Sequence, residues 1–122
     1  MSEIELDELA ARLGELPVLD VRSPQEFSGE GGYPCDPRQG HLPGSRRVDL
    51  GALLDELGQP LSPDAVRDAV GLPEGAEIVT YCHSGSRSAR AVLALRAAGY
   101  RARNYAGSWH EWSRHPELPL ER

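Results

Sequence analysis

The segment Ile78–Ser88, with the sequence IVTYCHSGSRS, decides which fold we expect for the whole chain. Residues 78–81 are mostly β-branched or aromatic, which is typical of a short buried strand. Cys82 follows at the expected strand end, residues 83–86 suit a tight loop, and residues 87–98 have helical spacing. The Cys82 thiol is therefore expected beside a helix amino terminus. Backbone N–H groups and the helix dipole would lower the pKa of the thiol there and favour a nucleophilic thiolate.

The rest of the sequence continues this alternation of strands and helices. Because strand, helix and strand follow one another, we expect an α/β fold: a small parallel β-sheet of about five strands, flanked by helices on both faces. Ser2 and Glu5 could form a capping box for the first helix. Trp109 and Trp112, on a short helix capped by Ser108, are expected to pack in the core or as a lid, with a hydrophobic substrate rim as the alternative. The expected strands are 18–21, 47–50, 77–81 and 101–105, and the expected helices are 4–13, 50–57, 62–70 and 89–98.

Size and composition indicate one domain over residues 1–122. A chain of this length can bury a core without disulfides, and 39% hydrophobic with 26% charged residues is ordinary for a globular protein. A net charge of −6 argues against a nucleic-acid partner or an acidic membrane surface. An anionic substrate would have to be met by local arginines and backbone dipoles.

The sequence also indicates where the protein resides and whether it needs a cofactor. No apolar stretch is long enough to span a bilayer, and the acidic, amphipathic amino terminus is unlike a signal peptide, so we expect a cytoplasmic protein without membrane contact. In that compartment Cys35 and Cys82 are expected to be reactive or incidental and not to form a structural disulfide. Because no paired Cys/His spacing suggests zinc, we expect no metal and no other cofactor.

Four motifs resemble those of the rhodanese family of sulfurtransferases. They are LDVRSPQEF (19–27), GHLPGS (40–45), CHSGSRS (82–88) and GSWHEW (107–112). The resemblance runs from about Leu19 to Leu120, in the family's order, and is to the catalytic half of two-domain thiosulfate and 3-mercaptopyruvate sulfurtransferases. It implies a rhodanese-like fold and a persulfide intermediate on Cys82.

The expected site centres on this cysteine. Gly85 is expected to supply a positive φ or a close approach in the loop. By the resemblance Asp20 supports the architecture around the loop, or it simply pairs with a neighbour at the strand end; His41 is expected to give structural support by hydrogen bonding to the loop backbone. The expected catalytic residue is Cys82, and the expected loop and substrate-binding residues are His83, Ser84, Gly85, Ser86, Arg87, Ser88 and Arg22.

Several of these side chains allow two interpretations. By the resemblance Arg22 reaches the substrate anion, or it pairs with a neighbour at the strand end. His41 is a base or a histidine that fixes a turn by hydrogen bonding, and His83 is a specificity residue or a solvent-facing side chain at the pocket mouth. Arg38 binds a substrate carboxylate or is solvated, and Cys35 is a resolving thiol or a surface bystander.

The predicted function is sulfur transfer through Cys82. The thiolate takes the outer sulfur of thiosulfate or 3-mercaptopyruvate and passes it to cyanide or a thiol. The alternative is a persulfide carrier or sensor that delivers sulfur to a protein partner. A Cys phosphatase or arsenate reductase is disfavoured because the loop between Cys82 and Arg87 is one residue shorter than theirs.

Overall fold

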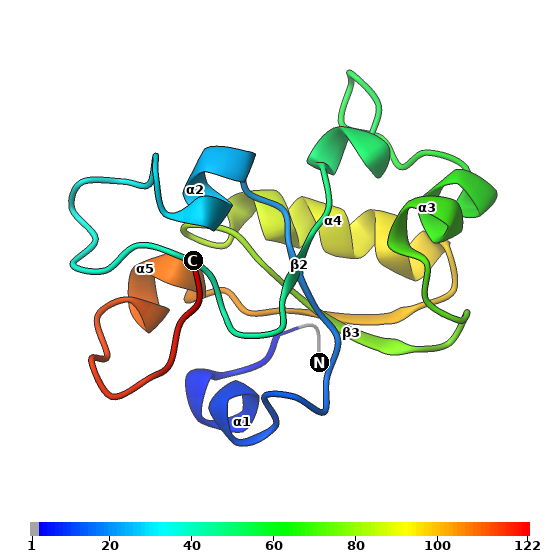
Figure 1. Ribbon diagram of the computed structural model, residues 1–122. Helices are drawn as coiled ribbons and strands as arrows, with labels where there is room; N and C mark the ends of the chain where they lie inside the picture. The colour runs from blue at the N-terminus through cyan, green and yellow to red at the C-terminus, as the bar shows by residue number, and fades with distance from the viewer. Residues whose placement is uncertain (1–2) are drawn as a thin grey trace.

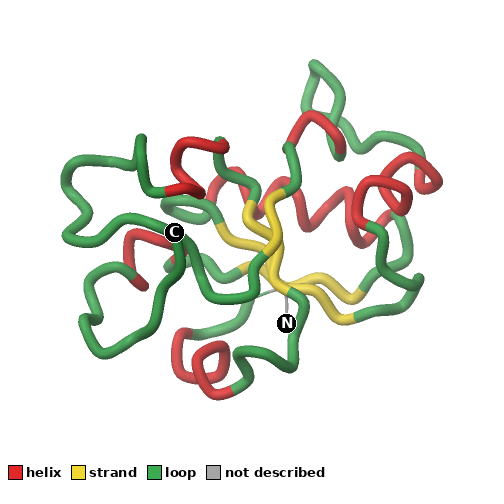
Figure 2. The backbone as a smooth tube through the Cα atoms, in the orientation of Figure 1, coloured by secondary structure: helices red, strands yellow, loops and turns green. Residues whose placement is uncertain are grey.

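A parallel β-sheet with the strand order β2-β1-β3-β4 runs through the centre of the structure, a computed structural model that describes residues 3–122 (Figures 1 and 2). The predicted α/β class and parallel sheet are confirmed, although about five strands was slightly too many: four occur among residues 3–122. The strands are β1 (Val18–Asp20), β2 (Arg46–Arg47), β3 (Glu77–Tyr81) and β4 (Arg101–Asn104).

Helices cover both faces of this sheet, as expected from the sequence (Figure 1). On one face α3 and α4 bury side chains such as Val66 and Leu95 against the sheet. On the other face α1 and α5 contribute Leu9, Trp109 and Trp112 to a second cluster. The helices are α1 (Leu6–Ala11), α2 (Pro24–Ser28), α3 (Pro63–Val70), α4 (Ser86–Ala97) and α5 (Ser108–Trp112), with a 3₁₀ turn η1 (Leu50–Ala52).

The sheet register brings the functional residues to one edge. Asp20, the last residue of β1, pairs with Tyr81, the last residue of β3. Since parallel strands end at the same edge, the segment after β1 and the loop after β3 leave the sheet side by side. Cys82 is the first residue of that loop.

Two local predictions were wrong. A helix over 50–57 is replaced by the short η1, because the Asp55 carboxylate accepts hydrogen bonds from the backbone N–H groups of Leu57 and Gln59, both at 2.9 Å. Such a local side-chain acceptor competes with helical bonding. The strand expected at 47–50 is β2, two residues long and shifted toward the amino terminus.

Predictions about helix starts had mixed outcomes. Ser62 caps α3 as predicted, with its hydroxyl 3.2 Å from the Ala65 N–H. Ser108 does not cap α5: the capping position is Gly107, and Ser108 is the first residue of the helix. The proposed capping role of Ser2 lies outside the described residues.

No helix within residues 3–122 has the length and apolar character needed to cross a membrane.

Candidate active site

Backbone N–H groups of the loop between β3 and α4 converge on the sulfur of Cys82. Gly85 N lies 3.1 Å from Sγ, Ser88 N 3.4 Å and Ser88 Oγ 3.3 Å. The residue is 1% exposed, so burial by itself raises the pKa of the thiol. The hydrogen bonds from Ser88 and from the amides of Gly85 and Ser84 outweigh burial, and the net effect lowers the pKa. The sulfur is enclosed, yet its surroundings favour the thiolate.

Removal of the Ser88 hydroxyl tests this electrostatic balance. In Ser88→Ala the pKa of the Cys82 thiol should rise, because burial remains while one stabilising donor is lost. Alkylation of Cys82, quantified by peptide mass spectrometry against pH, should then begin at higher pH than in the unchanged protein. Ser86→Ala is the matched control, since the Ser86 side chain is exposed. Equal pH profiles for Ser88→Ala and the unchanged protein would contradict this assignment of the donor.

Gly85 gives the loop its shape. Its φ is +94°, and a Cβ at this position would lie 2.6 Å from the carbonyl oxygen of Ala106. Both features expected from the sequence, positive φ and close packing, are present together. Both disfavour any residue with a Cβ at this position.

A glycine-to-alanine pair separates these two effects. Gly14 also has positive φ, at +95°, but a Cβ there meets nothing within 4 Å. Gly14→Ala should cost about 1–2 kcal/mol in the free energy of unfolding, from backbone strain alone. Gly85→Ala should cost about 1–3 kcal/mol more, because the added methyl also overpacks against backbone. Urea unfolding measures both values, and equal losses would refute the proposed contact with Ala106.

The first turn of α5 holds the backbone of the active loop. Trp109 N donates to the carbonyl of Cys82 at 3.0 Å, and His110 N to that of His83 at 2.9 Å. The Ser108 hydroxyl accepts from Cys82 N at 3.1 Å and donates to Tyr105 O at 2.8 Å. Ser108 has φ +54°, a conformation that non-glycine residues rarely adopt. Sequence reasoning missed this contact because nothing local to GSWHEW points to the loop.

Arg87 connects the active loop to α2. Its two terminal nitrogens lie 2.9 and 3.0 Å from the two carboxylate oxygens of Glu26. Hydrogen bonding to Glu26 raises the pKa of Arg87. Glu26 also completes a capping box with Ser23 at the start of α2. Glu26 is absent from the site residues predicted from the sequence. The motif SPQE, which is typical of a capping box, is the pattern that points to it.

Asp20 and Arg22 form a buried ion pair next to the loop. Nη2 of Arg22 lies 2.8 Å from Oδ2 of Asp20, and the two side chains are 1% and 0% exposed. The same Nη2 donates to the carbonyl of Gly40 at 2.6 Å, and the guanidinium lies 5.1 Å from the ring centroid of Trp109. Nε and Nη2 of Arg22 are therefore directed to Asp20 and Gly40 within the protein.

His41 and Arg38 also contact backbone. Nδ1 of His41 lies 2.7 Å from the Phe27 carbonyl oxygen, the turn-fixing arrangement weighed above. Arg38 is half-buried, and its nearest bonds run to the carbonyls of His115 at 2.7 Å and Leu118 at 2.8 Å. Two further bonds reach the carbonyls of Trp112 and Ser113. Arg38 thus holds the segment that follows α5.

The remaining loop side chains divide by exposure. Ser84 and Ser86 have exposed side chains. The His83 ring is mostly buried, stacked on Tyr33 with ring centroids 3.6 Å apart, and its Nε2 lies 2.9 Å from Oδ2 of Asp36. His83 is therefore not the solvent-facing side chain that one interpretation expected. Cys35 is exposed, and both cysteines are free.

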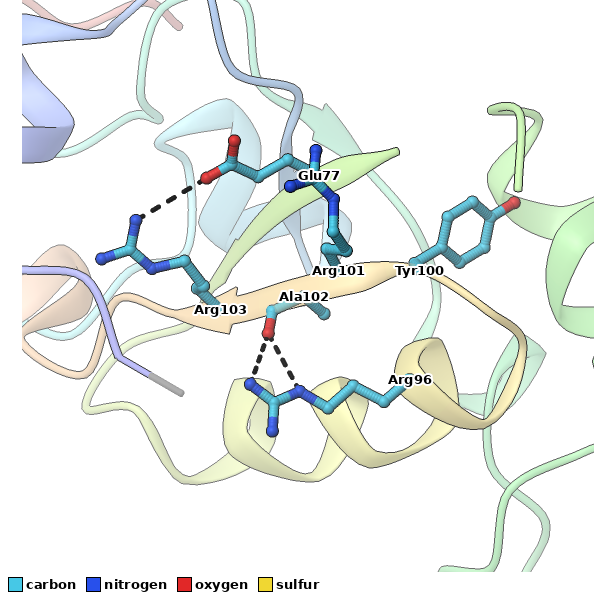
Figure 3. Close-up of a pocket in the computed structure, with 6 residues that line it drawn as sticks. All are labelled: Glu77, Arg96, Tyr100, Arg101, Ala102 and Arg103. Atoms are coloured by element: carbon cyan, nitrogen blue, oxygen red, sulfur yellow. Dashed lines mark hydrogen bonds and ion pairs between the residues drawn. The ribbon is translucent and has the colours of Figure 1, made fainter. Parts of the chain in front are cut away.

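A separate hollow lies at the other end of β3 and β4 (Figure 3). Arg96 donates to the Ala102 carbonyl there, and Arg103 lies 3.7 Å from Glu77. Glu77 is the first residue of β3 and Cys82 follows the last, so this hollow is not part of the cysteine site. Its lining residues are Glu77, Arg96, Tyr100, Arg101, Ala102 and Arg103.

Comparison with known proteins places this geometry in a family. The thiosulfate sulfurtransferase of Azotobacter vinelandii is 37% identical over 121 residues, which covers 94% of this chain and 44% of that protein. The sulfur carrier protein TtuD of Thermus thermophilus is 32% identical, covering 89% of this chain and 42% of its own length. A crystal structure of a probable thiosulfate sulfurtransferase superimposes with a TM-score of 0.83 at 44% identity, over 99% of this chain and 48% of that one.

The chain thus spans less than half the length of these relatives. The family model of the rhodanese-like domain matches residues 5–115, which include β3 and α4 on either side of the thiol loop, the loop itself and α5. The resemblance found in the four motifs is confirmed, and the chain belongs to the rhodanese family.

Proposed function

We propose that this chain is a sulfurtransferase that moves a sulfane sulfur from thiosulfate or 3-mercaptopyruvate to cyanide or a thiol through a persulfide on Cys82. The observation that carries the proposal is the convergence of the Gly85 and Ser88 amides and the Ser88 hydroxyl on Sγ. These donors stabilise a negatively charged sulfur, which is the nucleophile at the start and the end of such a cycle. The names of the sulfurtransferase relatives support the same reaction class.

The proposed cycle has two displacements. The Cys82 thiolate attacks the outer sulfur of thiosulfate, an S–S bond forms, the donor S–S bond breaks, and sulfite leaves with the electron pair. With 3-mercaptopyruvate the C–S bond breaks instead, and the departing pyruvate takes up a proton from solvent. The acceptor then attacks the terminal sulfur, and Cys82 leaves as a thiolate. No step calls for an organic cofactor.

The roles of the other residues follow from their contacts. Gly85 shapes the loop, Ser88 donates to the sulfur, and Arg87 anchors the loop to α2 through Glu26. Asp20 and Arg22 support the strand end as a buried pair, so our proposal leaves Arg22 out of substrate binding. The exposed Ser84 hydroxyl and the loop amides are the groups we propose to meet the donor anion.

A persulfide carrier that delivers sulfur to a protein partner is the second candidate. The observation in its favour is the similarity to a protein named as a sulfur carrier. Ping-pong turnover with thiosulfate and cyanide supports the transferase, whereas a persulfide that forms without turnover supports the carrier. In either case we propose that the cycle runs in the cytoplasm, where free thiols such as these two stay reduced.

Intact-protein mass measurement tests the shared step. After incubation with each donor, the protein should gain one sulfur atom, and peptide mapping should locate it on Cys82. Addition of cyanide or a thiol should remove it. A protein that gains no sulfur from either donor, or gains it on Cys35, would refute the proposed persulfide.

A further inference from the structure

Four side chains with metal-binding atoms meet beside the active loop: Cys35, Asp36, His83 and His110. Each offers one ligand atom, and these atoms all lie within 4.8 Å of one another. They come from three places in the chain: the loop after α2, the active loop and α5. Sequence inspection gave no hint of them because their spacing matches no zinc motif.

The centre of this cluster contains polar atoms without hydrogen-bond partners. Oδ2 of Asp36 and Nε2 of His83 lie 2.9 Å apart, yet the pair lacks hydrogen-bond geometry and neither atom has another partner. The Asp36 side chain is 0% exposed. Buried polar atoms are nearly always satisfied, so a ligand shared by this carboxylate oxygen and this imidazole nitrogen would satisfy both.

Arg114 fixes the other atoms of the cluster. Its Nη1 lies 2.8 Å from Oδ1 of Asp36 and 2.6 Å from the His110 carbonyl, and its Nη2 donates to the Cys35 carbonyl at 3.0 Å. These bonds engage Oδ1, which also lies 3.9 Å from Sγ of Cys35 and 3.6 Å from Nδ1 of His110, and they leave Oδ2 facing only His83. An outer partner that orients a ligand in this way is usual around protein-bound metals. Arg114 would be a positioning residue.

We propose that these residues bind one zinc ion, through Sγ of Cys35, Oδ2 of Asp36, Nε2 of His83 and Nδ1 of His110. Zinc accepts sulfur, nitrogen and oxygen ligands together and prefers four of them in a tetrahedron, at about 2.0–2.3 Å. Such bonds place neighbouring ligand atoms roughly 3.3–3.8 Å apart, so the wider pairs of the cluster, up to 4.8 Å, must contract while Asp36 and His83 separate slightly from 2.9 Å. On binding, the Cys35 thiol releases its proton to solvent and coordinates as thiolate.

The exposed ligands make this contraction and metal entry feasible. Cys35 is exposed and the His110 side chain is half exposed, so both can adjust, while Asp36 and His83 are held in place by Arg114 and by stacking on Tyr33. His83 directly follows Cys82. Zinc would therefore tie the active loop to α5 and to the loop after α2 without contacting the reacting sulfur.

Binding is measured on the full chain after chelator treatment and reduction. Zinc titration should show one equivalent bound and a rise in the melting temperature, since a ligand of the folded state stabilises it. Cobalt(II) should give the visible bands of a tetrahedral site and a near-ultraviolet thiolate charge-transfer band. Cys35→Ser should lose the charge-transfer band, and Cys35→Ser and His110→Ala should each weaken zinc binding by at least about tenfold.

Two control variants keep the test specific. His115→Ala removes a histidine that lies 3.3 Å from Glu117, outside the cluster, and should bind zinc like the unchanged protein. Cys82→Ser should retain both the stoichiometry and the charge-transfer band, which separates zinc binding from persulfide chemistry. The proposal is overturned if no equivalent of zinc binds, if Cys35→Ser and His110→Ala bind as tightly as the unchanged protein, or if the thiolate band disappears in Cys82→Ser.

Discussion

Cys82→Ser is expected to abolish sulfur transfer and to leave the fold intact. The serine oxygen fits where the sulfur now accepts hydrogen bonds from Gly85 and Ser88, so the loop has no reason to rearrange. A hydroxyl at this site cannot hold a sulfane sulfur. We expect turnover with thiosulfate and cyanide to fall by at least ~10³-fold, as when other enzymes lose their nucleophile.

Cys35 provides an internal control for this variant. Cys82→Ser still contains the exposed Cys35 thiol. If that thiol could accept the donor sulfur, the intact mass of the variant would still increase, and we expect no increase. Circular dichroism and urea unfolding should match the unchanged protein. Appreciable turnover in Cys82→Ser would contradict the persulfide mechanism.

Arg22→Met is expected to cause the largest loss of stability. The variant would leave the carboxylate of Asp20 buried at 0% exposure without its partner. Removal of one member of a buried ion pair costs about 3–5 kcal/mol, because the remaining charge is desolvated and unpaired. The Gly40 carbonyl also loses its donor. Urea unfolding monitored by tryptophan fluorescence measures the loss.

An exposed ion pair gives the matched comparison. Arg67 pairs with Asp64, whose side chain is 91% exposed, and also donates to the Ala98 carbonyl at 2.9 Å. Arg67→Met should therefore cost about 1–2 kcal/mol, from one weak ion pair and one hydrogen bond. The double variant Asp20→Asn with Arg22→Met should regain part of the lost stability, since no unpaired charge remains. Similar losses for Arg22→Met and Arg67→Met would mean that the buried pair is not the structural support we infer.

Local patterns predicted the parts of this fold that depend on neighbouring residues. The segment 78–88 contains its own strand, turn and helix signals, and β3 and α4 formed where they were expected. The helix expected at 50–57 failed because one side chain, Asp55, offered the backbone other hydrogen bonds. The apolar spacing of that segment does not reveal this competition.

The candidate site, too, could be predicted only where its residues are close together in the sequence. Cys82, Gly85 and Ser88 lie in one short loop, and their chemistry could be inferred from that loop alone. The contacts of Ser108 with Cys82, and of Asp36 with His83, join segments far apart in the chain. No single-sequence pattern encodes such pairings, since they depend on how α5 and the loop after α2 pack against the sheet edge.

The hydrogen bonds from α5 to the active loop have a consequence for synthesis of the protein. Residues 108–110, which hold the backbone of Cys82 and His83, leave the ribosome after the whole of β3 and α4. A nascent chain that ends before them contains the cysteine without its clamp. The thiol should therefore acquire its full hydrogen-bonded environment only once residues 108–110 have emerged and packed against the loop.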